Sequence, residues 1–269
     1  MNNSDKLLIE ADLHCHSLAS SHAYSTVMEN AAEAKKAGLK VFALTDHAMG
    51  MPDSPHKWHF HNLAAIPQQI DGVTVLRGVE ADIMNYYGDI DMEKEDLKCI
   101  QWAVASCHSP CITPGSIDDN TKAYINAVKK NPVIDVIGHC TTVTGEVDFE
   151  RIAKLCKEYN VFAELNESSL CFGRSSKENC IALLNACKKY EAYIVVNTDC
   201  HYAGIIGRTE HSSRLIDEIG FPKKLIFNTD AERVLEYVSK KHGIKFLKKD
   251  DIKNNKKPGS KEQKVNDVI

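Results

Sequence analysis

Short apolar runs alternate with longer segments of helical periodicity along most of the chain. The first run, residues 7–9, leads into a strand that ends at 12–16, and six further runs predict strands at 41–44, 73–79, 99–106, 135–137, 161–165 and 193–197. Helices are predicted at 27–37, 117–130, 148–159 and 177–190. Ser25 or Thr26 would cap the first helix and Gly38 would end it, and Asp148 would cap the third. Residues 48–61 are predicted to be a long polar loop.

This alternation predicts an α/β fold in which helices cover parallel strands. Seven strands in one domain of a 269-residue chain favour a closed or nearly closed barrel over an open sheet. The loops that follow the strands of such a barrel converge at the carboxyl ends of the strands. We therefore expect the chemistry of the protein to lie at that end.

The first predicted strand ends in Asp-Leu-His-Cys-His. Because side chains alternate across a strand, we expect His14 and His16 to share one face, about 7 Å apart, and Leu13 and Cys15 to share the other. Two imidazoles so placed can hold one cation, although such a pair is often no more than two solvated histidines. The remaining strand ends favour the metal interpretation.

Six of the seven predicted strands end in His, Glu or Asp. With the first loop they supply seven imidazoles and two carboxylates, namely His14, His16, His22, His47, Glu80, His108, His139, Asp199 and His201. Nitrogen and oxygen donors without thiolate suit zinc, manganese or iron better than calcium or magnesium. Nine donors are too many for one tetrahedral ion and enough for two or three ions with open positions, which indicates catalysis.

Composition and charge narrow the class of function. A net charge of −4 gives no basic face for long nucleic acids, so a phosphate-bearing substrate would need a local site. No apolar run approaches the roughly 20 residues of a membrane helix, and the first residues lack a signal-peptide pattern, so we expect a cytoplasmic protein. The ten cysteines include no Cys-x-x-Cys pair and are expected to be reduced thiols.

Several residues near the candidate ligands have open roles. Four cysteines adjoin ligands in sequence, and strand alternation should turn them outward, away from the pocket; they are Cys15, Cys107, Cys140 and Cys200. Asp12 and Asp46 could orient ligand imidazoles or could cap local turns. Glu167 could make the rim of the pocket less favourable to a polyanion.

Two loops could meet a substrate. His56, His59 and His61, beside Trp58, form either a lid or an ordinary surface loop. Arg174 follows the sixth strand, where its guanidinium could clamp phosphate oxygens in a fork; a surface salt bridge is the alternative.

Residues 247–269 differ in composition from the rest. From Lys248 onward seven lysines stand against four acids, and apolar residues are scarce. Such a segment cannot offset the entropy of ordering, so we expect a flexible tail after a single catalytic domain at residues 1–246.

The motifs resemble those of the PHP (polymerase and histidinol phosphatase) superfamily. The matching runs are Asp-Leu-His-Cys-His at 12–16, Ser-His-Ala-Tyr-Ser-Thr at 21–26, Thr-Asp-His at 45–47 and Leu-Arg-Gly-Val-Glu-Ala at 76–81. Pro-His-Lys-Trp-His-Phe at 55–60 and Asp-Cys-His at 199–201 make the chain most similar to the YcdX-type phosphatases, over about residues 7–243.

The resemblance implies a distorted seven-stranded (β/α)7, TIM-like barrel with three metal ions, usually zinc, at the carboxyl ends of the strands. Carried over residue by residue, it implies three ligand sets: His14, His16, Glu80 and Asp199; Glu80, His108 and His139; and His22, His47 and His201. Glu80 would bridge the first two ions. The chain departs from the family in having Cys140 where proline is frequent.

We therefore expect a metal-dependent phosphoric monoester hydrolase with a trinuclear centre of zinc, or of manganese or iron, acting on a small phosphorylated substrate. Glu80 would bridge the ions that activate water, Arg174 would neutralise phosphate oxygens, and Asp199, His201 or a metal-bound water would protonate the leaving alcohol. Alternatives are a histidinol phosphatase, a nucleotide or oligonucleotide 3′-5′ phosphoesterase, and a non-catalytic metal-binding module. Related proteins also imply a possible homo-oligomer.

Overall fold

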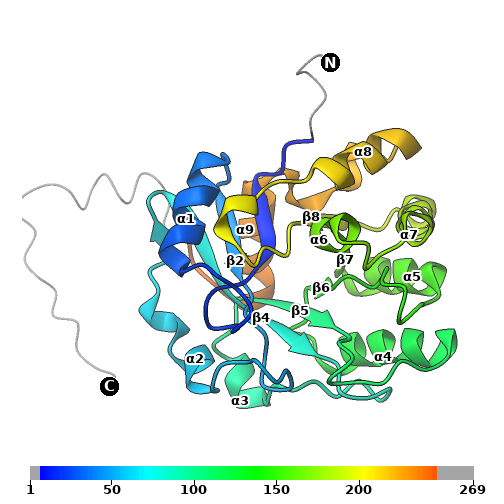
Figure 1. Cartoon of the computed structure of the whole chain (residues 1–269), viewed down its shortest axis with the longest axis horizontal. Helices are drawn as coiled ribbons and strands as arrows, with labels where there is room; N and C mark the ends of the chain where they lie inside the picture. Colours follow the sequence, from blue (N-terminus) through cyan, green and yellow to red (C-terminus); the bar gives the residue numbers. More distant parts are fainter. Residues whose placement is uncertain (1–6, 247–269) are drawn as a thin grey trace, which may run out of the picture.

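The structure is a computed structural model that describes residues 7–246 (Figure 1). Seven parallel strands form one curved sheet in the order β1-β2-β4-β5-β6-β7-β8. Their bounds are Ala11–Cys15 (β1), Val41–Leu44 (β2), Val73–Asp82 (β4), Trp102–Ser106 (β5), Val136–Ile137 (β6), Phe162–Asn166 (β7) and Ile194–Asn197 (β8). The two-residue strand β3 (Gln69–Ile70) pairs antiparallel with β4. The predicted α/β fold with a nearly closed barrel is confirmed.

Four helices match the predicted ones within one residue: α1 (Val27–Lys36), α4 (Ile117–Lys130), α5 (Phe149–Tyr159) and α7 (Lys177–Tyr190). The caps follow the sequence, because Thr26 accepts from the Glu29 amide and Asp148 accepts from the Arg151 amide. Further helices are α2 (Trp58–His61), α3 (Lys94–Leu97), α6 (Glu167–Cys171), α8 (Glu210–Ile219) and α9 (Ala231–His242). The polar loop predicted at 48–61 thus ends in a helical turn.

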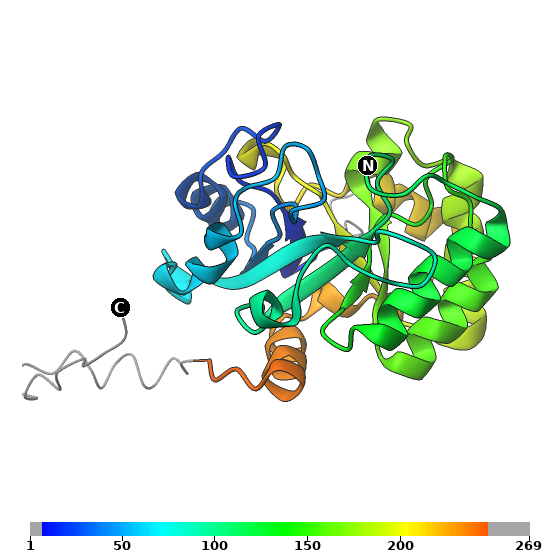
Figure 2. The ribbon, with the colours of Figure 1, turned by 90° about the horizontal axis from the view of Figure 1, so that it is seen from below.

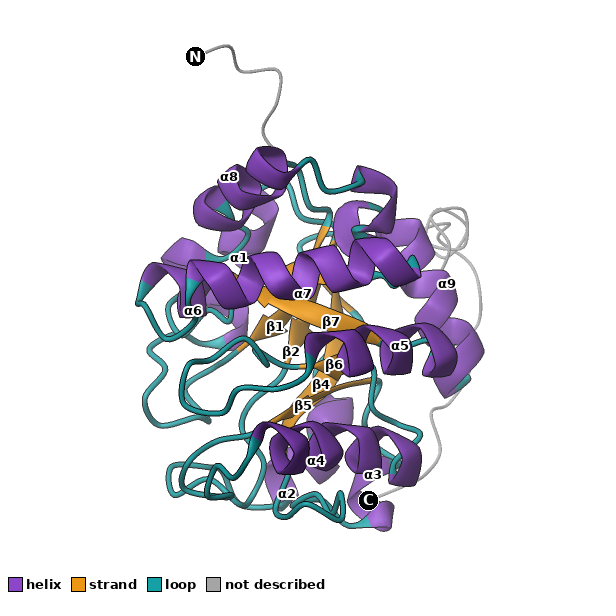
Figure 3. Cartoon of the chain, turned by 90° about the vertical axis from the view of Figure 1, so that its right-hand side faces the viewer, coloured by secondary structure: helices purple, strands orange, loops and turns teal. Residues whose placement is uncertain are grey.

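Two apolar layers hold the sheet. One lies between the strands and the outer helices, of which α4, α5 and α7 run across the strands in Figure 3. The other fills the barrel, where Leu13, Trp102 and Phe162 pack against Val234 and Val238 of α9. Figure 2 shows α9, in orange, beneath the strands. Since Trp102 and Phe162 begin β5 and β7, α9 covers the amino ends of the strands and leaves the carboxyl ends open.

One expectation about β1 is wrong. Leu13 packs inside the barrel and Cys15 packs against the outer helices, so these two side chains do not share a face. The register between β1 and β2 shifts between Asp12 and Cys15, which is the signature of a β-bulge. The bulge interrupts the alternation and turns His14, like Leu13, toward the interior.

Side chains close the seam between β1 and β8. The Leu13 amide donates to Asn197 Oδ1 at 3.0 Å, and the Asn228 side chain donates to the carbonyls of Ala11 and Val196, both at 2.7 Å. Asn228 Oδ1 also accepts from the Val196 amide at 3.0 Å. Because Asn228 lies after the last strand, the barrel is completed by a residue from outside the sheet.

No helix in the described part of the chain has the length and apolar character needed to cross a bilayer. The predicted tail at 247–269 lies outside the described residues, and the domain boundary before it stays a prediction.

Replacing Asn228 with alanine should loosen the seam. The change leaves two carbonyls and one amide buried without their partner, so we expect unfolding free energy to fall by about 2–4 kcal/mol in urea titrations. Asn185, exposed on α7, is the matched control, and its alanine variant should stay within about 0.5 kcal/mol of the parent. Equal stability of the two variants would contradict this account of the seam.

Candidate metal centre

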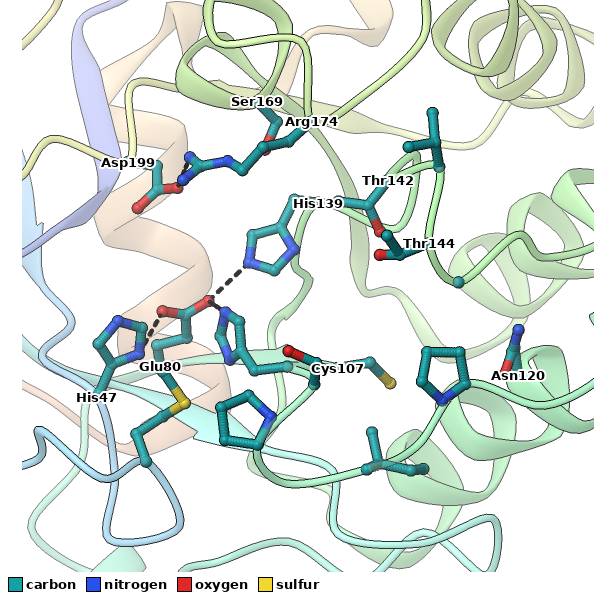
Figure 4. Close-up of a pocket in the computed structure, with 18 of the residues that line it drawn as sticks. His47, Glu80, Cys107, Asn120, His139, Thr142, Thr144, Ser169, Arg174 and Asp199 are labelled. Carbon is teal, nitrogen blue, oxygen red and sulfur yellow. Dashed lines mark hydrogen bonds and ion pairs between the residues drawn. The ribbon is translucent and has the colours of Figure 1, made fainter.

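The carboxylate of Glu80, buried near the end of β4, is the meeting point of the candidate ligands. Its Oε2 lies 3.3 Å from His14 Nε2, 3.4 Å from His16 Nε2 and 3.0 Å from His47 Nδ1. Its Oε1 lies 3.0 Å from His139 Nε2 and 3.6 Å from His108 Nε2. Figure 4 shows Glu80 between His47 and His139. The two oxygens therefore face different imidazoles, which is what a bridging carboxylate requires.

Asp199 and His201, just after β8, reach the same cluster. Asp199 Oδ1 lies 3.2 Å from His16 Nε2 and 3.7 Å from His14 Nε2. The ring of His201 stacks on that of His16 with centroids 4.2 Å apart. The first ligand set implied by the resemblance is thus gathered around one point.

The third implied set is less compact than the first. The His22 ring stacks on those of His201 and His47, with centroids 4.4 Å and 5.2 Å apart, while His47 and His201 are 6.0 Å apart. His22 Nδ1 is bound to Asp53, and half of the His22 side chain is exposed. His22 therefore faces the site from its outer side.

Within residues 7–246, three groups of side chains hold donor atoms within 4.8 Å of one another: His16, His47 and His201; His14, His16 and Glu80; and His47, Glu80 and His108. Several of these donors are buried without a hydrogen bond to any described residue, including His14 Nε2, His16 Nε2 and His201 Nε2, and the same holds for the neighbouring Asp199 Oδ1. Buried polar atoms are costly when unpaired. A cation would satisfy them, and nitrogen with carboxylate oxygen is a donor set that suits zinc, manganese or iron.

The charges of the cluster depend on one another. Burial would raise the pKa of the Glu80 carboxyl, but the imidazoles around it, led by His14, hold that pKa well below its usual value. Burial likewise opposes protonation of His108, yet Glu80 and Asp82 raise its pKa to about 9. Burial and the nearby His201 lower the pKa of His16 to about 3. A cation that takes His108 as a ligand must displace its proton, so binding should weaken as pH falls.

Two carboxylates that the sequence reasoning missed orient ligand imidazoles. Glu164 on β7 contacts His14 Nδ1 at 2.8 Å, and Asp82 on β4 contacts His108 Nδ1 at 2.7 Å. Such partners fix the ring and make the other nitrogen a better ligand. Two sequence features could have pointed to these residues: Glu164 is a charged residue inside an apolar strand, and Asp82 follows Glu80 by two residues.

Asp46 and Asp12 have different roles. Asp46 accepts from the Ser20 hydroxyl at 2.9 Å, and Ser20 Oγ lies 3.3 Å from His16 Nδ1, so Asp46 acts on a ligand imidazole through Ser20. Asp12 accepts from the amide and hydroxyl of Thr198, and so fastens the start of the loop that carries Asp199.

Two candidate ligands lie on unusual backbone. His139 and Asp199 both have positive φ, of 22° and 52°, a region that non-glycine residues seldom occupy. Gly138 is required before His139, since a Cβ there would overlap the hydroxyl of Ser106, which donates to Glu80 Oε1 at 2.6 Å. Such conformations concentrate at functional sites.

Most of these donors line a cavity of about 470 Å³ (Figure 4), whereas His14 and His16 are fully buried and do not line it. Arg174 lines it and donates to Asp199 Oδ2 at 3.4 Å, while half of its side chain remains exposed. The guanidinium is therefore next to the ligand cluster without being locked there. The predicted phosphate clamp has the required position, and its role stays a prediction.

Several neighbouring residues differ from expectation. Cys15, Cys140 and Cys200 are buried in the outer core, as predicted, but Cys107 lines the cavity, because it follows the end of β5 where strand alternation no longer applies. Glu167 does not reach the rim, since its carboxylate accepts from the amides of His211 and Ser212 and caps α8.

The histidine-rich loop does not line the cavity. His59 points to Asp46 with 3.2 Å between Nε2 and Oδ2, and His61 is bound to Asp96. His56 packs edge-on against Trp58. In this structure His59 of the segment contacts Asp46, which lies behind the candidate ligands, and none of residues 56–61 lines the cavity as a lid would.

Fold and site together define a barrel protein whose histidines and carboxylates can bind metal at the carboxyl ends of its strands. The PHP domain family model matches residues 12–248. A probable phosphatase of Caldicellulosiruptor saccharolyticus is 42% identical over 232 residues, which cover 86% of this chain and 97% of that protein. A probable phosphatase of Clostridium acetobutylicum is 40% identical over 235 residues, which cover 87% and 96%.

Among solved structures, the chain is similar to histidinol phosphate phosphatase from Lactococcus lactis, crystallised with zinc, L-histidinol and phosphate. The TM-score is 0.59 at 19% identity, and the match covers 80% of this chain and 95% of that one. At this identity the likeness bears on the fold alone.

The chain therefore belongs to the PHP domain family, and its enzyme class is that of the phosphatases. The family predicted from the sequence motifs is confirmed. The roles of the individual site residues stay predictions.

Replacing Glu164 with glutamine should weaken metal binding. The variant keeps the shape of the side chain but loses the charge that faces His14 Nδ1, so we expect about a 10- to 100-fold lower zinc affinity in competition titrations with a chromogenic chelator. Glu167→Gln is the control: it removes a buried carboxylate that caps α8 and should lower stability without changing zinc affinity. Unchanged affinity in Glu164→Gln would exclude the orienting role.

Proposed function

We propose that the protein is a metal-dependent phosphoric monoester hydrolase that acts on a small phosphorylated substrate. The observation that supports it is the gathering of six imidazoles and two carboxylates from the strand ends into one cluster beside one cavity: His14, His16, His47, Glu80, His108, His139, Asp199 and His201. His22 adjoins them at the outer side. Zinc is the proposed metal, with up to three ions; manganese or iron would also suit these donors.

Bound cations would supply Lewis-acid activation of water and neutralisation of phosphate charge. Glu80 would be a ligand shared by two of their sites, since its two oxygens face different imidazoles. Asp199 would complete the first site together with His14 and His16.

The chain's own residues would act on the substrate around these sites. Arg174, next to Asp199 and half exposed, can turn toward phosphate oxygens and bind two of them in a fork. The imidazoles hold the carboxyl pKa of Asp199 well below its usual value against the effect of burial, which favours Asp199 as a ligand over a proton donor. Burial also lowers the pKa of His201, whose Nε2 is buried and unpaired within the described residues, so His201 too is better suited to a neutral ligand than to a proton donor.

Histidinol phosphate and nucleotide esters remain alternative substrates on the same site. A non-catalytic metal-binding module is less well supported, because the ligands keep open access to a cavity that also contains Arg174. The acidic net charge disfavours long nucleic acids as partners. A homo-oligomer and a cytoplasmic location remain part of the proposal.

Metal removal should abolish activity. We expect that dialysis against EDTA will eliminate hydrolysis of a phosphate monoester such as phenyl phosphate, and that added zinc or manganese will restore it, because water activation depends on the cations. Full turnover in a sample shown by elemental analysis to be free of metal would refute the proposal.

Replacing Arg174 with alanine should lower kcat/KM by about 10- to 100-fold, because the phosphate loses a charge-assisted partner in the transition state. Arg174→Lys should recover part of this loss, since lysine keeps the charge but not the fork. Arg214→Ala, on the exposed face of α8, is the control and should leave kcat/KM unchanged. Steady-state kinetics on phenyl phosphate measure all three, and full activity in Arg174→Ala would exclude the clamp.

A further inference from the structure

The cavity has two unlike ends. In Figure 4, Glu80, His47 and Asp199 lie on one side, whereas Asn120 and Thr144 lie on the opposite side, beyond Cys107. The first end contains the ligand cluster and Arg174. We call the second end the arm; it is formed by the loops after β5 and β6 together with the side of α4.

The wall of the arm is mostly apolar. Among the residues that line the cavity, Ile112 and Pro114 come from the part of the loop after β5 that leads to α4, Val143 from the loop after β6, and Tyr124 from α4. Ile112 and Tyr124 are buried and belong to the outer core, so this wall is held in place by packing. Val143 is half exposed and borders the opening.

Two polar side chains in the arm are hydrogen-bonded to backbone groups. The Asn120 amide accepts from the Gly115 amide at 2.8 Å and donates to the Glu146 carbonyl at 3.1 Å. The Tyr124 hydroxyl donates to the Gly138 carbonyl at 3.4 Å. The hydroxyls of Ser109, Thr142 and Thr144 also line the cavity, and they are uncharged.

Charge is confined to the first end. Among the described residues that line the cavity, the carboxylates are Glu80 and Asp199, both in the ligand cluster, and the guanidinium is that of Arg174 beside them. The lining contains no lysine. An ammonium group or a second phosphate that entered the arm would meet no side chain of opposite charge.

We propose that the phosphate ester hydrolysed here carries an uncharged leaving group with an alkyl or aryl face, which lies in the arm while the phosphate lies at the ligand cluster and Arg174. This rests on the proposed function and specifies its substrate class. Desolvating a charge without a partner is expensive, whereas an apolar group gains from burial against Ile112 and Pro114. The inference disfavours amino alcohol phosphates, histidinol phosphate among them, and bisphosphates.

Binding tests the inference without a catalytic step. Butylphosphonate and 3-aminopropylphosphonate have the same shape and differ by a terminal methyl or ammonium group. Calorimetric titration of the zinc-loaded protein should give at least about a tenfold lower Kd for butylphosphonate, which corresponds to about 1.4 kcal/mol. Equal or tighter binding of the ammonium compound would overturn the inference.

Variants at the half-exposed Val143 locate the effect in the arm. Val143→Asp should shift the ratio of the two Kd values by about tenfold in favour of the ammonium compound, because a carboxylate then faces it. Val143→Asn is the matched control, with the same size and no charge, and should weaken butylphosphonate without favouring its rival. Equal ratios of the two Kd values in both variants would mean that the methyl or ammonium end of the ligand lies outside the arm, and would refute the proposal that the leaving group binds there.

Turnover separates this inference from the proposed function. Hydrolysis of butyl and phenyl phosphate with higher kcat/KM than 3-aminopropyl phosphate supports both. Preference for 3-aminopropyl phosphate, or for a bisphosphate, overturns the substrate class and leaves the phosphatase proposal intact. If the zinc-loaded protein hydrolyses none of these esters, the proposed function fails, and the substrate class fails with it.

Discussion

The buried carboxylate of Glu80 determines which side chains can lie around it at the carboxyl ends of the strands. Glu80 is nearly inaccessible to water, and an isolated charge there would cost several kcal/mol. Five imidazoles lie within 3.6 Å of its oxygens, and carboxylates in turn stand behind two of those rings. Each buried charge in this cluster avoids most of its desolvation cost only because a group of opposite charge lies beside it. The same mutual dependence gives a cation a prepared position, since it would replace protons that the cluster otherwise needs for balance.

The fold supports this arrangement through irregular backbone at the carboxyl ends of the strands, where regular strand geometry would not direct these side chains toward Glu80. A bulge in β1 turns His14 toward the interior next to Leu13, and positive φ angles aim His139 and Asp199 from the loops that follow β6 and β8. The strands that carry these loops are packed at their amino ends against α9. Stability is concentrated at one end of the barrel and chemistry at the other.

Much of this could be predicted from sequence because the signals were local. Apolar runs predicted the strands, helical periodicity predicted four helices within one residue, and histidines at strand ends predicted the cluster around Glu80. Features that depend on tertiary contacts could not be predicted. The bulge at Leu13 leaves no mark in a pattern of alternating residues. Glu167 resembles a surface acid until the start of α8 is known to lie against it.

The same limit applies to the residues around the ligands. Glu164 sits in an apolar strand, and only the proximity of His14 shows that its charge has a use. Cys107 looked like its three counterparts, yet it lines the cavity because β5 ends at Ser106, just before it. Sequence position alone does not tell which side of a strand end a side chain will take.

The seam between β1 and β8 also sets the order in which the protein can acquire its site during synthesis. His14 and His16 leave the ribosome before Asp199 and His201, which follow nearly two hundred residues later, and Asn228, which joins the two edges, comes later still. Loops this long are slow to close. The nascent chain therefore carries its first histidines unpaired with Asp199 and His201 while the intervening residues are made, and the complete metal-binding pocket can form only after Asn228 has been added.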